Sequence, residues 1–121
     1  MNIVINHDLD TPIYRQIVEQ IALQIIHKDL QPNELLPSIR TIALDLKISV
    51  ITSKKAYEEL EAMGLIYTVS KKGCFVSEIK HDEIIKGLHD LALDRLKKDI
   101  EFYKAMGLTL IDLIDLLKEL Q

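Results

Sequence analysis

The order in which helical and extended apolar patterns follow one another is the feature that most constrains how this chain can fold. Apolar residues recur at steps of three and four in five segments, which predicts amphipathic helices. These segments are residues 12–28, 39–46, 50–63, 82–106 and 110–120. Between the third and fourth segments, two β-prone runs, 65–69 and 74–77, flank a glycine-containing stretch. That arrangement predicts a β-hairpin with the four-residue loop 70–73.

Residues suited to helix ends mark the boundaries of the first three helices. Thr11 is expected to cap the first helix, with Pro12 at its first position, where a missing amide costs nothing. Ser38 and Ser49 are expected to cap the second and third helices, and Gly64 suits the position just after the third. The break between the second and third helices is therefore short.

Three helices, the last two joined by a tight break and followed by a hairpin, form a winged helix-turn-helix. We therefore expect a mainly α protein with a small β-hairpin, of the α+β class. Its winged helix-turn-helix is expected over residues 1–78 and a two-helix tail over residues 79–121. In the tail, Thr109 and Asp112 have the spacing of a capping box.

Composition excludes several classes of protein. A chain of 121 residues with 48% hydrophobic and 28% charged residues is expected to fold as one ordinary domain with a short appendage. One cysteine excludes a disulfide framework and a multi-thiolate zinc site, and we expect Cys74 to be a core residue, not a redox switch. The apolar runs are too short to span a membrane, and residues 1–10 lack the basic region of a signal peptide, so we expect a soluble cytoplasmic protein.

The residues that catalysis or metal binding requires are not arranged for either. The sequence contains no phosphate-binding glycine loop, no nucleophile elbow and no paired catalytic carboxylates with a plausible pocket. The four histidines do not form a close ligand pair on one helix. We therefore expect a protein that is not an enzyme and that holds no cofactor and no metal.

Four stretches of the predicted winged helix carry a specific joint pattern: PIYRQI at 12–17, LLPSIRTIALDLKIS at 35–49, KAYEELEAMGLI at 55–66 and GCFV at 73–76. In these stretches the chain resembles the DNA-binding domain of the GntR family of bacterial transcription regulators. The short tail, with AMGLTLIDLIDLL at 105–117, is similar to the YtrA-type subfamily. The resemblance implies a DNA-binding regulator, most often a repressor, for which transporter operons are common targets.

The distribution of charge agrees with double-stranded DNA as the partner. The chain has a net charge of −4, yet residues 36–57 carry four basic residues against Asp45 alone, a local net of +3. The second helix is expected to hold the DNA backbone, the start of the third to enter the major groove, and the hairpin tip to reach the neighbouring backbone or minor groove. The predicted DNA-binding residues are Ser38, Arg40, Ser49, Val50, Ile51, Thr52, Lys54, Lys55, Ser70, Lys71 and Lys72.

Four residues depart from the family pattern. Val50 and Ile51 stand where family members often have basic or polar residues; they can pack on thymine methyl groups, so base preference is expected to lean toward A·T. Asn33 replaces a glycine, a tolerable change because asparagine also adopts left-handed backbone. Lys71 replaces a glycine common at the hairpin tip, which puts the shape of the wing in doubt.

The tail is expected to form a homodimer. Its last helix is apolar on more than one face, and one partner helix cannot cover it. A dimer would place two recognition helices about one DNA turn apart on an inverted-repeat operator. The predicted dimerisation residues are Leu88, Leu96, Ile100, Tyr103, Leu110, Leu113, Ile114 and Leu117. Two alternatives stay open: a winged-helix adaptor that binds proteins without reading DNA, and a sensor whose small-molecule effector lies between the tail helices.

Overall fold

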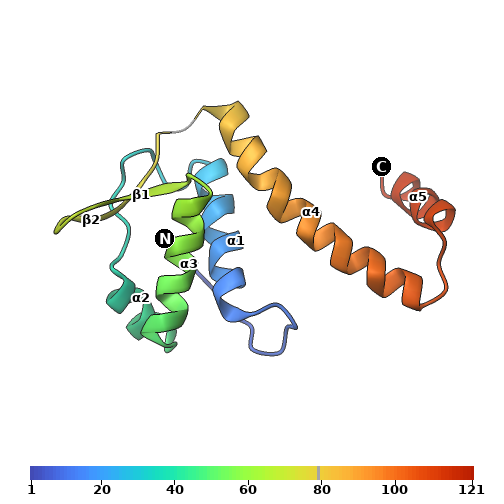
Figure 1. Cartoon of the computed structure of the whole chain (residues 1–121), viewed down its shortest axis with the longest axis horizontal. Coiled ribbons are helices and arrows are strands. Elements are labelled where there is room, and N and C mark those ends of the chain that lie inside the picture. The colour runs from blue at the N-terminus through green and yellow to red at the C-terminus, as the bar shows by residue number, and fades with distance from the viewer. Residues whose placement is uncertain (79) are drawn as a thin grey trace. The chain divides into compact units, whose positions relative to one another are not determined.

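The computed structural model of the chain describes residues 1–78 and 80–121 and is mainly helical with one small antiparallel sheet (Figure 1). The fold class expected from the sequence is confirmed. In chain order the elements are α1 (Ile13–Ile26), α2 (Ile39–Leu46), α3 (Val50–Ala62), β1 (Ile66–Val69), β2 (Gly73–Val76), α4 (His81–Ala105) and α5 (Leu110–Glu119). The described chain divides into two compact units, Met1–Gly87 and Leu88–Gln121. The boundary expected between residues 78 and 79 falls beside residue 79, outside the described residues, and stays a prediction.

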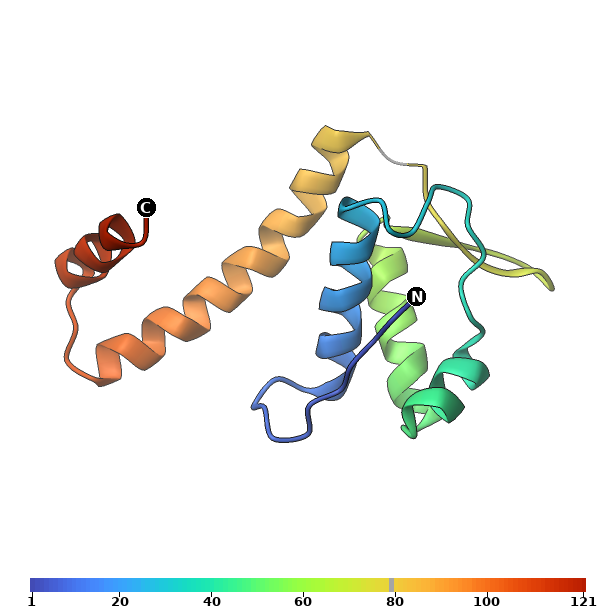
Figure 2. The ribbon, with the colours of Figure 1, turned by 180° about the vertical axis from the view of Figure 1, so that it is seen from behind.

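The core of the first unit lies where α1 packs along α3, a pairing seen from both sides in Figures 1 and 2. Side chains of α1 and α3 and the bases of the strands fill it. They are Ile17, Val18, Ile21, Ala22, Ala56, Tyr57, Leu60, Leu65, Ile66 and Val76. The Tyr57 hydroxyl donates a hydrogen bond of 2.6 Å to the carbonyl oxygen of Pro37, which fixes the loop before α2 against α3. Burial raises the pKa of this hydroxyl, so it stays a neutral donor.

The start of α1 differs from the expectation. Pro12 is the N-cap residue itself, with extended backbone, and no side chain caps the helix, so the capping role expected for Thr11 is wrong. The carbonyl oxygen of Thr11 instead accepts a hydrogen bond of 2.9 Å from Nε2 of Gln16. That contact ties Thr11 to α1, and an extended N-terminal arm, which the sequence pattern did not predict, precedes the turns at residues 7–11.

This arm, residues 2–6, lies along α1 and is held by glutamine side chains spaced four residues apart (Figure 2). The amide group of Gln16 both accepts from the backbone N–H of Asn6 and donates to its carbonyl, each at 2.9 Å. Gln20 does the same with Val4, at 2.9 and 2.7 Å. Four residues of helix rise about 6 Å, which is about the length of two residues of extended chain. Glutamines four residues apart on α1 can therefore pair with every second residue of the arm, as a neighbouring strand would.

The other helix ends agree with the expectations. The hydroxyls of Ser38 and Ser49 accept hydrogen bonds from backbone amides three residues later, and Gly64 follows α3 with a left-handed φ of 77°. The capping box before α5 is complete, because Thr109 Oγ1 accepts from the N–H of Asp112, and Asp112 Oδ2 accepts from the N–H of Thr109. Local sequence signals therefore determine four of these helix boundaries.

The hairpin is tighter than expected. Strand β1 pairs with β2 from Ile66 opposite Val76 to Val69 opposite Gly73, so the loop has three residues, 70–72, and the expected four-residue loop is wrong. Gly73 is paired and therefore belongs to β2. Lys71 takes the left-handed φ of 65° that a glycine would adopt without strain, so the wing keeps its turn. Asn33 is also left-handed, as expected for the residue in a glycine's place.

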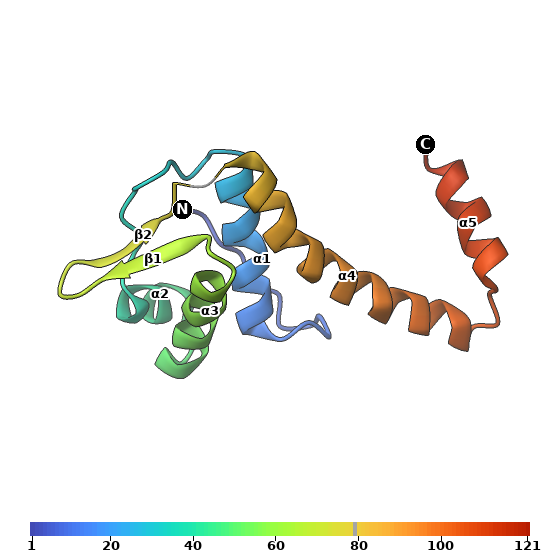
Figure 3. The same cartoon turned by 45° about the horizontal axis from the view of Figure 1, so that its top comes forward.

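The second unit consists of the later part of α4 and helix α5, which diverge after Gly107 in the shape of a V (Figures 1 and 3). Of the predicted dimerisation residues, Leu113 is buried at 8% exposure, and Leu88 and Ile100 are half-buried. The other five are exposed: Leu96, Tyr103, Leu110, Ile114 and Leu117. Among the described residues, no helix is both long enough and apolar enough to cross a membrane.

Candidate nucleic-acid interface

The turn between α2 and α3 presents the first turn of α3 to solvent. Lys47 adopts a left-handed φ of 56°, and the N–H of Ile48 donates a hydrogen bond of 3.0 Å to the carbonyl oxygen of Ala43. These two features end α2 just after Leu46. Ser49 then begins α3. As a result Val50 is 49% exposed and Ile51 80% exposed, although both are apolar. These are the two residues expected to contact base edges.

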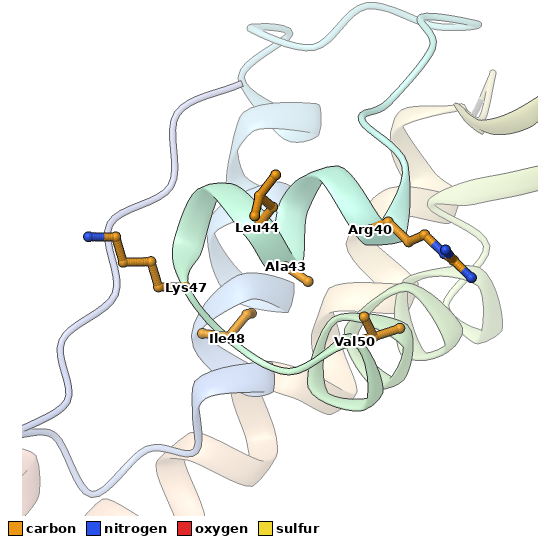
Figure 4. Close-up of a pocket in the computed structure, with 6 residues that line it drawn as sticks. All are labelled: Arg40, Ala43, Leu44, Lys47, Ile48 and Val50. Atoms are coloured by element: carbon orange, nitrogen blue, oxygen red, sulfur yellow. The ribbon is translucent and has the colours of Figure 1, made fainter.

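A shallow hollow of about 620 Å³ lies beside this turn (Figure 4). Its floor is apolar, from Ala43, Leu44 and Ile48, and Val50 closes one side. Arg40 and Lys47 also line it, and their side chains extend in opposite directions from the two ends of α2. The hollow therefore places an apolar surface between two cationic groups, one of which is the predicted backbone contact Arg40.

Leu44 is a member of this surface that the sequence analysis missed, and it is 79% exposed. Ile42 and Ala43 lie on the apolar face of α2 and are buried. Leu44 lies off that face, on the polar side of a short helix, where an aliphatic side chain is directed to solvent. This position was the sequence signal that could have identified it.

Two matched hydroxyl pairs lie at the beginnings of α2 and α3. Ser38 Oγ donates to Thr41 Oγ1 at 2.8 Å, and Ser49 Oγ donates to Thr52 Oγ1 at 2.7 Å. Each serine also accepts its threonine's backbone N–H, so both serine hydroxyls are occupied as caps. Each threonine hydroxyl accepts in its pair, so its own proton is available to another acceptor. Thr41 was missed in the sequence, where the repeated Ser-x-x-Thr spacing was the signal.

The two lysines of α3 have different surroundings. Lys54 is 64% exposed, and its Nζ lies 3.9 Å from Oε1 of Glu58, one helical turn on. Lys55 Nζ lies 4.0 Å from the centre of the Tyr14 ring, so this cation packs on α1. Both lysines are exposed, and they differ in what their ammonium groups contact.

The wing tip carries Ser70, Lys71 and Lys72, and all three are exposed. Figures 1 and 3 show the hairpin extending from the first unit on the side where α2 lies. The chain before α2 runs beside β2: Asn33 donates its N–H to the carbonyl of Val76 at 2.7 Å, and Leu36 donates to that of Cys74 at 2.8 Å. The wing is thus tied to the segment that leads into α2.

Cys74 and the histidines provide no metal centre in the part of the chain that the structure describes. No group of three His, Cys, Asp or Glu residues there could hold an ion. Cys74 is half-buried, with its Sγ 3.4 Å from the hydroxyl oxygen of Thr68. This is the environment of a small residue packed in the sheet.

Comparison with known proteins points to one family. Residues 13–76 match the model of the bacterial regulatory proteins of the gntR family. The chain is 33% identical over 108 residues to the HTH-type transcriptional regulator YhcF of Bacillus subtilis, covering 88% of each chain. It is 32% identical over 110 residues to the HTH-type transcriptional repressor YtrA of the same organism, covering 91% of this chain and 85% of that one.

Solved structures agree. A GntR family transcriptional regulator from Listeria monocytogenes superposes with a TM-score of 0.67 at 29% identity, covering 94% of this chain and 99% of that chain. The DNA-binding domain of AraR, in complex with the operator ORX1, superposes with a TM-score of 0.56 at 26% identity, covering 64% of this chain and 96% of that chain.

Proposed function

The chain belongs to the GntR family of bacterial regulatory proteins, and from this premise we propose that it is a transcriptional repressor that binds an operator as a homodimer. The observation that carries the proposal is the exposed first turn of α3, where Val50 and Ile51 lie beside the hollow lined by Arg40. Exposed apolar residues at the start of a recognition helix are placed to contact base edges. The family relationship favours this function over the protein adaptor considered above.

Contacts to the DNA backbone come from both sides of the turn in this proposal. Arg40 and Lys54 supply positive charge, and the hydroxyls of Thr41 and Thr52 donate to phosphate oxygens. Ser38 and Ser49 act through these threonines, because their own hydroxyls cap the helices. Lys55 contributes less than expected from the sequence, since its ammonium lies on the Tyr14 ring.

The wing contacts DNA through its tip. Ser70, Lys71 and Lys72 are exposed, and the left-handed backbone at Lys71 turns the tip tightly enough to enter a minor groove or lie along its phosphates. This contact depends on the charge and the shape of the DNA backbone and groove, and not on which bases are present.

Dimerisation through α4 and α5 is supported by the apolar surface that a single chain leaves uncovered. Eleven large apolar side chains of the second unit are exposed: Leu93, Leu96, Phe102, Tyr103, Met106, Leu110, Ile111, Ile114, Leu116, Leu117 and Leu120. Stable folded monomers rarely expose a continuous patch of this kind. A second copy offers the same surface, and twofold symmetry then requires an inverted-repeat operator.

The operator test separates reading of bases from general attraction to DNA. Duplexes selected from a random pool by the wild-type protein serve as operator, and a random-sequence duplex of equal length as reference. Val50→Ala is expected to lose about 1 kcal/mol on the selected duplex and little on the reference. A loss of equal size on both would assign Val50 to the fold.

The dimer test uses a residue that is exposed in the single chain. Leu117 is 60% exposed, so Leu117→Glu disturbs no packing within one chain and should separate the dimer. Gln121→Glu adds the same charge at the end of the same segment and should leave the dimer intact. Sedimentation at micromolar concentration reports both; a wild-type monomer that binds its selected duplex tightly would refute dimerisation.

A further inference from the structure

The recognition helix is not basic along its length. Its first half carries Lys54 and Lys55, and its second half carries Glu58, Glu59 and Glu61, so α3 as a whole has a net charge of −1. The local net charge of +3 over residues 36–57 does not include these glutamates, because that range ends inside α3. Three carboxylates on an element that approaches DNA phosphates oppose binding unless they are neutralised or turned away.

Two of the three carboxylates are engaged by the body of the first unit. Glu59 Oε2 lies 3.6 Å from Nη1 of Arg15 on α1, and both side chains are mostly covered. Glu61 Oε2 accepts a hydrogen bond of 3.3 Å from the Thr68 hydroxyl on β1. These contacts give Glu59 and Glu61 structural roles between α3 and its neighbours.

Glu58 has a different environment. It is 64% exposed and follows Ile51 and Lys54 along one face of α3, at helical spacings of three and four residues. Eight residues beyond Val50 correspond to about 12 Å along the helix axis, which is about the width of the major groove. A helix that inserts its first turn into the groove therefore holds Glu58 near the groove edge, where the phosphates lie.

We propose that Glu58 is a positioning residue that limits the affinity of this protein for DNA of any sequence, by pairing with Lys54. The 3.9 Å contact holds the Lys54 ammonium on the helix, and a phosphate must compete with this carboxylate for it. The exposed pair is weak, so it reduces the phosphate contact without abolishing it. Binding then depends more heavily on the base contacts of Val50 and Ile51. This inference rests on the proposed DNA-binding function.

The test is a double-mutant cycle on the full chain, with a random-sequence duplex and a duplex selected by the wild-type protein as probes. Glu58→Gln should tighten binding to both duplexes by about twofold to fivefold, the range expected for releasing one exposed pair. The gain should shrink as salt is raised, because exposed charges are screened. In the Lys54→Ala background, Glu58→Gln should give a clearly smaller gain, because only the direct repulsion between Glu58 and the phosphates is then left to relieve.

Asp29→Asn is the matched control, since it removes one exposed carboxylate from the loop after α1 and should leave affinity unchanged. Equal affinities of Glu58→Gln and wild type would overturn the inference, and so would a gain of the same size with and without Lys54. A loss confined to one base pair of the selected duplex would also overturn it, because Glu58 would then read a cytosine amino group. Failure of the wild-type protein to bind either duplex would instead refute the proposed function.

Discussion

Replacing Gln16 with leucine should detach the N-terminal arm from α1. The Gln16 side chain is buried and makes three hydrogen bonds of 2.9 Å: one from the N–H of Asn6, one to the carbonyl of Asn6 and one to that of Thr11. Leucine has nearly the same length and no polar atom. The change therefore removes the bonds while keeping most of the volume.

The expected loss of stability follows from these contacts. Each hydrogen bond contributes about 0.5–1.5 kcal/mol net, so three give an upper range of about 1.5–4.5 kcal/mol. The arm limits the loss, because it can leave α1 and hydrate its own N–H and carbonyl groups once the pairing is gone. We therefore expect Gln16→Leu to lower the free energy of unfolding by about 2 kcal/mol.

Urea unfolding with an unchanged m-value measures this loss, and amide exchange at Val4 and Asn6 reports the arm directly. Gln24→Leu is the graded control: Gln24 makes one exposed hydrogen bond, to the carbonyl of Asn2, and its loss should cost less than 0.5 kcal/mol, about the limit for exposed sites. A Gln16→Leu variant as stable as the Gln24→Leu variant, with Asn6 still protected from exchange, would refute the account of the arm.

Three further changes have expected outcomes. Tyr57→Phe removes the hydrogen bond to Pro37 and should lower the free energy of unfolding in urea by about 1–2 kcal/mol. Because burial raises the pKa of Tyr57, the stability of the wild-type protein should also fall as the pH rises above about 10. The variant should lack this dependence on Tyr57. Lys71→Gly relieves a left-handed backbone and should raise the melting temperature, by an amount corresponding to about 0.5–1 kcal/mol, while weakening DNA binding. Hydrogen bonds from the backbone and side chain of Thr109 lower the pKa of Asp112, so its contribution to α5 is present at neutral pH and lost as the pH falls through that lowered pKa. Circular dichroism should show this acid loss of helix, and Asp112→Asn, which does not titrate, should abolish the pH dependence.

Local chemistry explains which parts of the fold the sequence predicted. Ser38, Ser49 and Thr109 satisfy amide groups within three residues of themselves, and Gly64 adopts its left-handed conformation without any partner. Such signals act over a few residues, so a single sequence is enough to recognise them. The order of the helices and the hairpin followed from them, and with it the helix-turn-helix that exposes Val50 and Ile51.

The sequence did not predict contacts between segments far apart in the chain. Thr11 looks like a cap, but its carbonyl is bound by Gln16 and its neighbourhood is set by an arm lying on α1. The Lys55 ammonium lies 4.0 Å from the centre of the Tyr14 ring on another helix, a contact that the sequence did not predict, and its assignment to DNA stays a prediction. Neither partner shares a sequence motif with the residue it binds. Three-dimensional packing decided both cases.

Two exposed apolar surfaces distinguish the roles of the two units. In the first unit Leu44, Val50 and Ile51 form a small surface with Arg40 and Lys47 beside it, and an anionic duplex that presents methyl groups satisfies both components. In the second unit the exposed aliphatic and aromatic side chains are many, and α5 carries Asp112 and Asp115 among them. A phosphate backbone would be repelled there, whereas the proposed second copy of the same helices would bury the apolar area and leave the carboxylates at its edge. The charge beside the apolar residues thus supports both proposals, DNA binding at the first surface and self-association at the second.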